Sequence, residues 1–352
     1  MEKKERIQSL DYIRVIACLM VVIVHASEWF YVSNDVINRN PYDGFWVAVI
    51  NSACRCSVPL FLMVSAYLLV PLRGSATTFF RTRFIRVVIP FAIWSLIYAL
   101  YPIITNGWTE NISKELATLL INFNYSAQHL WFVYMLLGIY LLVPIISPWI
   151  RQASKRQMQC YLGIWFFTTF FPYMYTAYEY LYGECPWNKF GLFWYFSGFI
   201  GYVIMAEYIK KYVEWSLKKS LLICIPMFVG AYIFTAVVWF NRLAWAESVP
   251  ELELSWGFCT PNVALCSFAA FVLFRHIKNT PTGLYKIVRR ISELSYGIYL
   301  EHLLVLYFVL PSMLDLFSTP FTICLAGIIV FIICTILSQL ISYIPKSKYL
   351  IG

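Results

Sequence analysis

The chain has 352 residues, of which 61% are hydrophobic and only 13% are charged, and its mean hydropathy is +0.68. These values exclude an ordinary water-soluble fold. The formal net charge of +9 is compatible with a nucleic-acid binder, so the distribution of the basic residues has to decide between nucleic acid and membrane.

Apolar runs recur along the whole length, and each is long enough to cross a bilayer. No hydrophilic stretch is long enough to form a soluble domain, so residues 1–352 are expected to form a single integral-membrane domain. We predict an all-α polytopic membrane protein with about ten transmembrane helices, at residues 10–31, 45–70, 84–105, 129–149, 160–178, 191–209, 220–240, 258–276, 293–313 and 320–344.

Most lysines and arginines lie in the N-terminal tail and in alternate loops, such as 73–86, 151–156, 210–219 and 275–290. Because cytoplasmic loops carry an excess of basic residues, this alternation predicts that both termini are cytoplasmic. The basic excess then reflects topology and contact with anionic membrane lipid, and no nucleic-acid partner is expected.

The first predicted span carries four ionisable residues: Asp11, Arg14, His25 and Glu28. Arg14 and His25 are eleven residues apart, which is about three helical turns and about 16 Å along the axis. Asp11 and Glu28 fall one turn outside this pair, on the same stripe. Charges in hydrocarbon are costly, so the stripe is expected to face a cavity or other protein and to have a function.

The second span contains Arg55, four residues before the helix-breaking Pro59. An arginine inside the membrane is expected either to line a site or to pair with an acid such as Glu28. Before the third span, Arg83 and Arg86 are three residues apart and share a helix face. Two neighbouring guanidiniums suit a phosphate, although flanking arginines are also ordinary topology signals.

His129 and Trp131 open the fourth span, and Glu301 and His302 lie within the ninth. Each could serve a site, or could be an interfacial or packing residue. The loop before the fourth span is expected to hold a short amphipathic helix at 113–122 with Ser113 as its N-cap. Cys185 and Cys259 could form a bridge at the outer face, although free thiols are favoured.

Several common chemistries find no support in this sequence. Phosphate-binding glycine loops, an HExxH motif and a GxSxG motif are all missing. The four histidines lack the spacing of a local metal site, so no metal is expected.

Five motifs in this order resemble the membrane acyltransferase-3 family, in particular its stand-alone members that O-acylate surface polysaccharides such as enterobacterial common antigen. The residues that carry the resemblance are Arg14 with His25, Ser57–Phe61 running to Ser65–Tyr67, Arg83 with Arg86, His129–Phe132, and Ser295–Tyr299 with His302. The likeness covers nearly the whole chain. Ala66 and Val15 stand where the family commonly has glycine, which adds bulk without removing a titratable group.

The resemblance implies an O-acyltransferase of the bacterial cytoplasmic (inner) membrane. The donor would be acetyl-CoA from the cytoplasm, and the acceptor a hydroxyl of an envelope glycan or its lipid-linked precursor. It assigns essential roles to Arg14 and His25 and places the phosphates of CoA at Arg83 and Arg86. A homo-oligomer is left open.

These implications lead to a mechanistic hypothesis. His25 would be the general base, because a neutral imidazole suits this role at pH 7. Glu28 would orient the imidazole, Arg14 would hold the donor, and Arg55 would stabilise the oxyanion. Asp11 would fix the rotamer of Arg14.

The acceptor is expected to contact three further residues: His129, Trp131 and His302. Two other classes remain open from the residues themselves. A proton-coupled transporter of a small molecule would also carry intramembrane ionisable groups. A catalytically silent subunit of a glycan-assembly machine is the third reading.

Overall fold

The computed structural model describes residues 6–33, 35–119, 125–178, 196–278, 280–314 and 316–352. These residues are almost entirely helical, and the prediction of an all-α polytopic membrane protein is confirmed. The α-helices are α1 (Gln8–Glu28), α2 (Pro41–Cys54), α3 (Ser57–Leu69), α4 (Ala76–Arg83), α5 (Ile89–Leu100), α6 (Ile103–Asn106), α7 (Glu110–Ala117), α8 (Trp131–Gln152), α9 (Lys155–Thr168), α10 (Phe171–Ala177), α11 (Ile200–Tyr212), α12 (Leu217–Arg242), α13 (Val249–Leu252), α14 (Pro261–Phe274), α15 (Thr282–Val309), α16 (Thr319–Ile341) and α17 (Lys348–Ile351).

Shorter elements complete the chain. A π-helical turn, η1 (Phe84–Val88), joins α4 to α5, and 3₁₀ turns are η2 (Tyr125–Leu130), η3 (Leu254–Trp256) and η4 (Leu310–Ser312). The strands β1 (Val32–Ser33) and β2 (Val36–Ile37) pair antiparallel in a two-residue hairpin after α1.

Eight helical segments in the described ranges are long and apolar enough to cross a membrane, and each corresponds to a predicted span. They are Gln8–Glu28, Pro41–Leu69, Ala76–Leu100, Ala127–Gln152, Leu217–Arg242, Leu254–Phe274, Thr282–Ser312 and Thr319–Ile341.

The two other predicted spans, 160–178 and 191–209, are not single long helices where the structure describes them. α9 ends at Thr168, and α10 begins at Phe171 with Pro172 in its first turn. Proline lacks the backbone N–H that a continuing helix needs, so the apolar run is broken there. α11 begins only at Ile200, and residues 179–195, including Cys185, lie outside the described part, so the count of ten and the Cys185–Cys259 bridge stay predictions.

Two local features depart from regular helix. The second span breaks between α2 and α3 at Arg55 and Cys56, just ahead of Pro59, as the proline suggested. The amphipathic helix predicted at 113–122 is instead α7. It begins earlier because the Thr109 side chain accepts a hydrogen bond from the Ile112 N–H and caps it in place of Ser113.

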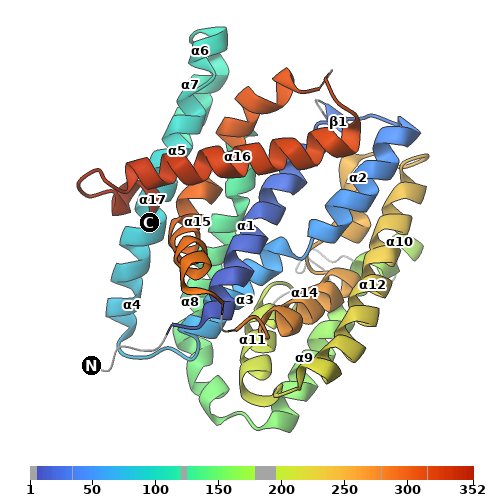
Figure 1. The fold of residues 1–352 in the computed structure, drawn as a ribbon, viewed down its shortest axis with the longest axis vertical. Helices are drawn as coiled ribbons and strands as arrows, with labels where there is room; N and C mark the ends of the chain where they lie inside the picture. Colours follow the sequence, from blue (N-terminus) through green and yellow to red (C-terminus); the bar gives the residue numbers. More distant parts are fainter. Residues whose placement is uncertain (1–5, 34, 120–124, 179–195, 279, 315) are drawn as a thin grey trace, which may run out of the picture.

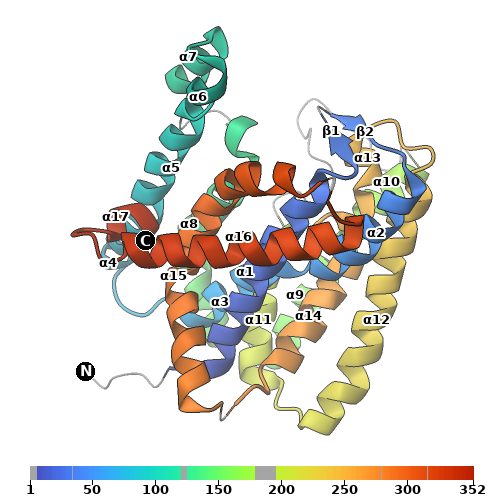
Figure 2. The same ribbon diagram turned by 45° about the horizontal axis from the view of Figure 1, so that its top comes forward.

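α1 lies in the middle of the bundle and packs against α2, α3, α15 and α16. α16 runs across α1 in both views, while α6 and α7 extend from α5 away from the bundle (Figures 1 and 2). α16 approaches α1 closely at Gly327, where an added Cβ would lie 2.8 Å from Ile23 Cγ1. The helix that carries Arg14 and His25 is therefore surrounded by protein over much of its length.

Candidate active site

A cavity of about 750 Å³ lies beside the N-terminal half of α1. Its wall carries five basic side chains together with apolar and aromatic ones, and we refer to it as the basic cavity. The basic side chains that line it are Arg6, Arg14, Arg83, Arg86 and Lys348, and the apolar and aromatic ones include Val21, Val58, Phe61, Phe132, Leu136, Tyr140, Tyr296 and Tyr299. Such a cavity suits an elongated ligand with an anionic end and a less polar arm.

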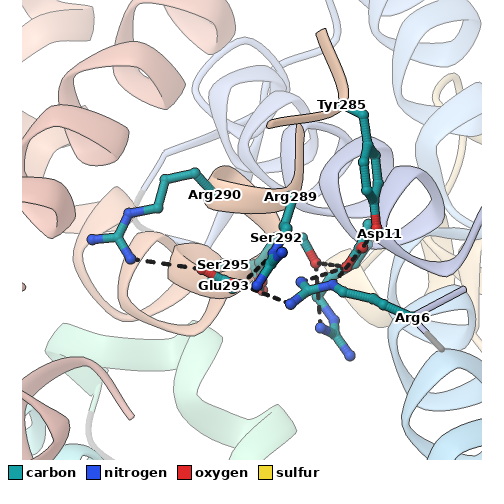
Figure 3. Close-up of polar contacts among 9 residues, drawn as sticks. Arg6, Asp11, Tyr285, Arg289, Arg290, Ser292, Glu293 and Ser295 are labelled. Carbon is teal, nitrogen blue, oxygen red and sulfur yellow. Dashed lines mark hydrogen bonds and ion pairs between the residues drawn. The ribbon is translucent and has the colours of Figure 1, made fainter. Parts of the chain in front are cut away.

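A network of polar contacts joins the start of α1 to α15 in the wall of the basic cavity (Figure 3). Asp11 accepts hydrogen bonds from Arg6 at 2.7 and 2.8 Å, from the Ser292 hydroxyl at 2.7 Å and from the Tyr285 hydroxyl at 2.8 Å. Arg6 also donates to Glu293 at 2.7 Å. The hydrogen bonds to Asp11 raise the pKa of Arg6, and the charges of Asp11 and Glu293 act in the same direction.

This network leaves Arg14 without a carboxylate partner among the described residues. The side chain reaches Ser292 Oγ at 3.3 Å, and Ser292 in turn donates to Asp11. The prediction that Asp11 fixes Arg14 directly is therefore wrong, because Arg6 takes that carboxylate. A guanidinium that lines a cavity and has no carboxylate bonded to it directly is suited to bind an anion.

Arg83 and Arg86 both line the basic cavity, as their spacing suggested. Arg83 ends α4, and Arg86 lies in the π-helical turn η1. Arg83 lies 5.7 Å from the Phe79 ring and 5.8 Å from the Tyr140 ring, and its buried Nε has no hydrogen-bond partner in the described residues. The pair adds further donors to the side of the cavity that Arg6 and Arg14 line.

At the other end of α1, three histidines form a compact group, which we call the histidine cluster: His25 of α1, His129 of η2 and His302 of α15. The ring centroids are 5.2 Å apart for His25 and His302, 6.2 Å for His25 and His129, and 4.9 Å for His129 and His302. Residues from three distant parts of the chain therefore meet at one point.

The hydrogen bonds of the histidine cluster define which ring nitrogens are free. Nδ1 of His25 lies 2.9 Å from Glu28 Oε2, and in the tautomer that donates this hydrogen bond from Nδ1 the Nε2 lone pair is free. His302 donates from Nδ1 to the Tyr299 carbonyl at 2.6 Å. Neither ring nitrogen of the buried His129 has a hydrogen-bond partner in the described residues, and the same holds for Nε2 of His302.

Arg55 forms a second polar group near the C-terminal half of α1. It donates from Nε to Asn51 at 2.6 Å, Asn51 donates to Ser27 at 2.7 Å, and the guanidinium lies 4.2 Å from the Trp256 ring. Arg55 is buried, and among the described residues its Nη2 has no hydrogen-bond partner and it forms no ion pair with Glu28. It is thus a buried donor held in place by Asn51.

Glu253 and Tyr31 adjoin this group, and no motif in the sequence indicates either of them. The Tyr31 hydroxyl donates to Glu253. Burial raises the pKa of Glu253 above its ordinary value, the nearby charge of Arg55 opposes the rise, and Glu28 adds to it. Glu253 precedes η3 in a stretch that reads as an outer loop, so only the fold brings it towards Arg55.

Trp131 does not join the histidine cluster by any ring contact that involves the described residues. Its ring stacks on Phe258 with centroids 5.4 Å apart, and Phe258 lies 5.9 Å from the Arg55 guanidinium. Trp131 therefore adjoins the Arg55 group. Within the part of the chain that the structure covers, no group of three or more His, Cys, Asp or Glu residues could hold a metal ion.

These features define an all-helical, multi-pass membrane protein that has a basic cavity at one end of its central helix and buried histidines at the other. A family model described as an acyltransferase domain matches residues 7–339. The chain therefore belongs to the acyltransferase-3 family and is a membrane O-acyltransferase. No curated protein and no solved structure matches it.

Proposed function

We propose that the protein transfers an acetyl group from cytoplasmic acetyl-CoA to a hydroxyl of a bacterial envelope glycan or its lipid-linked precursor, in the cytoplasmic (inner) membrane. The observation that carries the proposal is the alignment along α1. Arg14 lines an arginine-rich cavity, and His25 lies about 16 Å further along the same helix. The family match favours this enzyme over a proton-coupled transporter.

The basic cavity fits the donor chemically. Arg83 and Arg86 would bind its phosphates, because a guanidinium offers a planar fork of donors to an oxyanion. Arg14 has no carboxylate to compete with that ligand among the described residues. The apolar part of the cavity, with Val58 and Leu136, would take the less polar thioester arm.

His25 is the general base of this proposal. Its Nε2 removes the proton from the acceptor hydroxyl, whose oxygen attacks the thioester carbonyl carbon. The carbon–sulfur bond then breaks, and His25 returns the proton to the departing thiolate, so that an ester and free CoA result. Glu28 stabilises the imidazolium from Nδ1.

Arg55 and the remaining residues of the site have supporting roles. Nη2 of Arg55, which has no partner in the described part of the chain, would donate to the oxyanion that develops on the carbonyl. His129 and His302 would hydrogen-bond to the acceptor through nitrogens that lack partners in the described residues, and Trp131 would offer it an aromatic face.

Donor binding tests the first half of this proposal. In nanodiscs, we expect acetyl-CoA to bind, and the double variant Arg83→Gln/Arg86→Gln to bind it at least about 10-fold more weakly, because hydrogen bonds to charged groups contribute about 1.5–3 kcal/mol each. Isothermal titration calorimetry measures this difference. Arg81→Gln is the matched control, since Arg81 is exposed on the same helix and does not line the cavity. Equal affinity in the double variant and the wild type would contradict the donor site.

A further inference from the structure

Two aromatic side chains in the wall of the basic cavity contact each other, and one of them also contacts the histidine cluster. Phe132 of α8 and Tyr299 of α15 both line the cavity, and they are only 8% and 7% exposed. Their ring centroids are 5.6 Å apart at an interplanar angle of 67°. Phe61, also in the cavity wall, lies 6.4 Å from Phe132 and extends this aromatic boundary.

The same tyrosine also contacts the histidine cluster. The Tyr299 ring lies 5.5 Å from the His129 ring and 5.9 Å from the His302 ring. Its hydroxyl donates to the His129 carbonyl at 2.5 Å, and its own carbonyl accepts from His302 at 2.6 Å. Tyr299 therefore bounds the basic cavity and the histidine cluster at once, and it is held in position from both ends.

Distances along α1 give the position of this boundary. Val21 also lines the cavity, and it lies seven residues beyond Arg14, or about 10 Å along the helix. His25 is four residues further, about 6 Å beyond Val21, and it does not line the cavity. A ligand anchored at Arg14 can thus reach Val21 inside the cavity, and the last helical turn before His25 lies outside the cavity lining.

We propose that Phe132 and Tyr299 form an aromatic partition that sets the largest acyl group able to pass from the basic cavity to His25; this inference rests on the proposed acyl transfer. A short acyl group passes after a small displacement of the rings. Each added methylene requires space that the two buried rings already fill, and close-packed interiors give way only at a cost.

Truncation of the partition tests this proposal through chain-length selectivity. The measured quantity is the ratio of initial rates with hexanoyl-CoA and acetyl-CoA in nanodiscs. We expect Phe132→Ala to raise this ratio at least 10-fold over the wild type, and Phe132→Leu to raise it less. Phe271→Ala is the matched control, because Phe271 is fully buried in α14 and does not line the basic cavity. An unchanged ratio in both Phe132 variants would overturn the proposal.

A second readout does not depend on acyl transfer. Diethyl pyrocarbonate modifies accessible imidazoles, and mass spectrometry measures the rate at each histidine. We expect Phe132→Ala to increase the modification rate of His129 at least 5-fold, with no change at His276, which bonds to Ser220 elsewhere in the protein. If the wild type consumes no acyl-CoA of any length, the proposed function fails. The modification rate of His129 then still tests whether the two rings close the cavity. Equal rates in variant and wild type would overturn the partition.

Discussion

At the scale of single residues, the partners of Asp11 and Arg14 show what spacing does and does not determine. Both residues lie on one stripe of α1, as a helical period predicts, and both line the basic cavity. Their direct pairing was predicted from proximity, yet Arg6 takes the Asp11 carboxylate. Arg6 precedes the helix, so no helical spacing rule could identify it as the partner.

For His25 and Glu28, sequence spacing was sufficient to predict that the two side chains contact each other. Residues three apart on a helix are neighbours, and the Nδ1–Oε2 contact of 2.9 Å is the one expected. The base role of His25 stays a proposal. Glu253 could not be found in this way, because 222 residues separate it from Tyr31, its hydrogen-bond partner.

The raised pKa of Glu253 leads to a prediction about pH and stability. Burial favours the neutral form of the Glu253 carboxyl in the folded protein. The contribution of this carboxyl to the free energy of unfolding is therefore complete below the ordinary glutamate pKa of about 4.3. It is lost as the pH rises through the folded-state pKa. We expect Glu253→Gln, which stays neutral, to gain in thermal midpoint relative to the wild type as pH rises above about 4.3. Tryptophan fluorescence during heating in nanodiscs at several pH values measures this difference.

The control for Glu253→Gln is Glu110→Gln. Glu110 is exposed and pairs only with Lys114 at the surface in the described structure, so its substitution should leave the pH dependence of the thermal midpoint unchanged. Parallel curves for Glu253→Gln and the wild type would show that this carboxyl is not destabilised by burial.

At the scale of elements, the length of an apolar run predicts that a membrane-spanning helix exists, but it does not predict where that helix is broken. All eight membrane-length segments of the described structure coincide with predicted spans. The break between α9 and α10 follows from Pro172, a signal that was present in the sequence and outweighed by the apolar run. The π-helical turn at Phe84–Val88 had no such signal, since it depends on how α4 and α5 pack.

The crossing of α1 and α16 predicts a stability effect. A side chain at Gly327 would meet Ile23, two residues before His25. We expect Gly327→Val to destabilise the protein by about 1–3 kcal/mol, because buried helices accommodate added volume poorly. The thermal midpoint should fall by several degrees on heating in nanodiscs.

Gly230→Val is the matched control for this substitution. Gly230 lies inside α12, and an added Cβ there meets no atom within 4 Å, so the same change of residue adds volume without a clash. Equal thermal midpoints for the two variants would mean that α16 does not pack against α1 as described.

At the scale of the whole molecule, the active-site candidates come from segments that only the fold brings together. His25, His129 and His302 belong to three elements spread over most of the chain, and their rings lie within 6.2 Å of one another. The residue types and their order along the chain indicate the family, and the family match agrees. The convergence of the three rings could not be predicted, because it depends on how α1, η2 and α15 pack.

The basic cavity and the histidine cluster lie at different positions along α1. The basic cavity lies beside the first half of α1, and the histidine cluster lies at its other end. In the proposed reaction, the donor and the acceptor would therefore meet near His25 from opposite directions.

The most direct test is transfer of a labelled acetyl group from acetyl-CoA to a lipid-linked envelope glycan by the protein in nanodiscs. We expect CoA release and labelled glycan with the wild type, loss of at least about 100-fold in rate for His25→Ala, and no loss for His276→Ala, a histidine outside the cluster. Near-normal transfer by His25→Ala would contradict the assignment of the base, and failure of the wild type to transfer the label would contradict the proposed reaction.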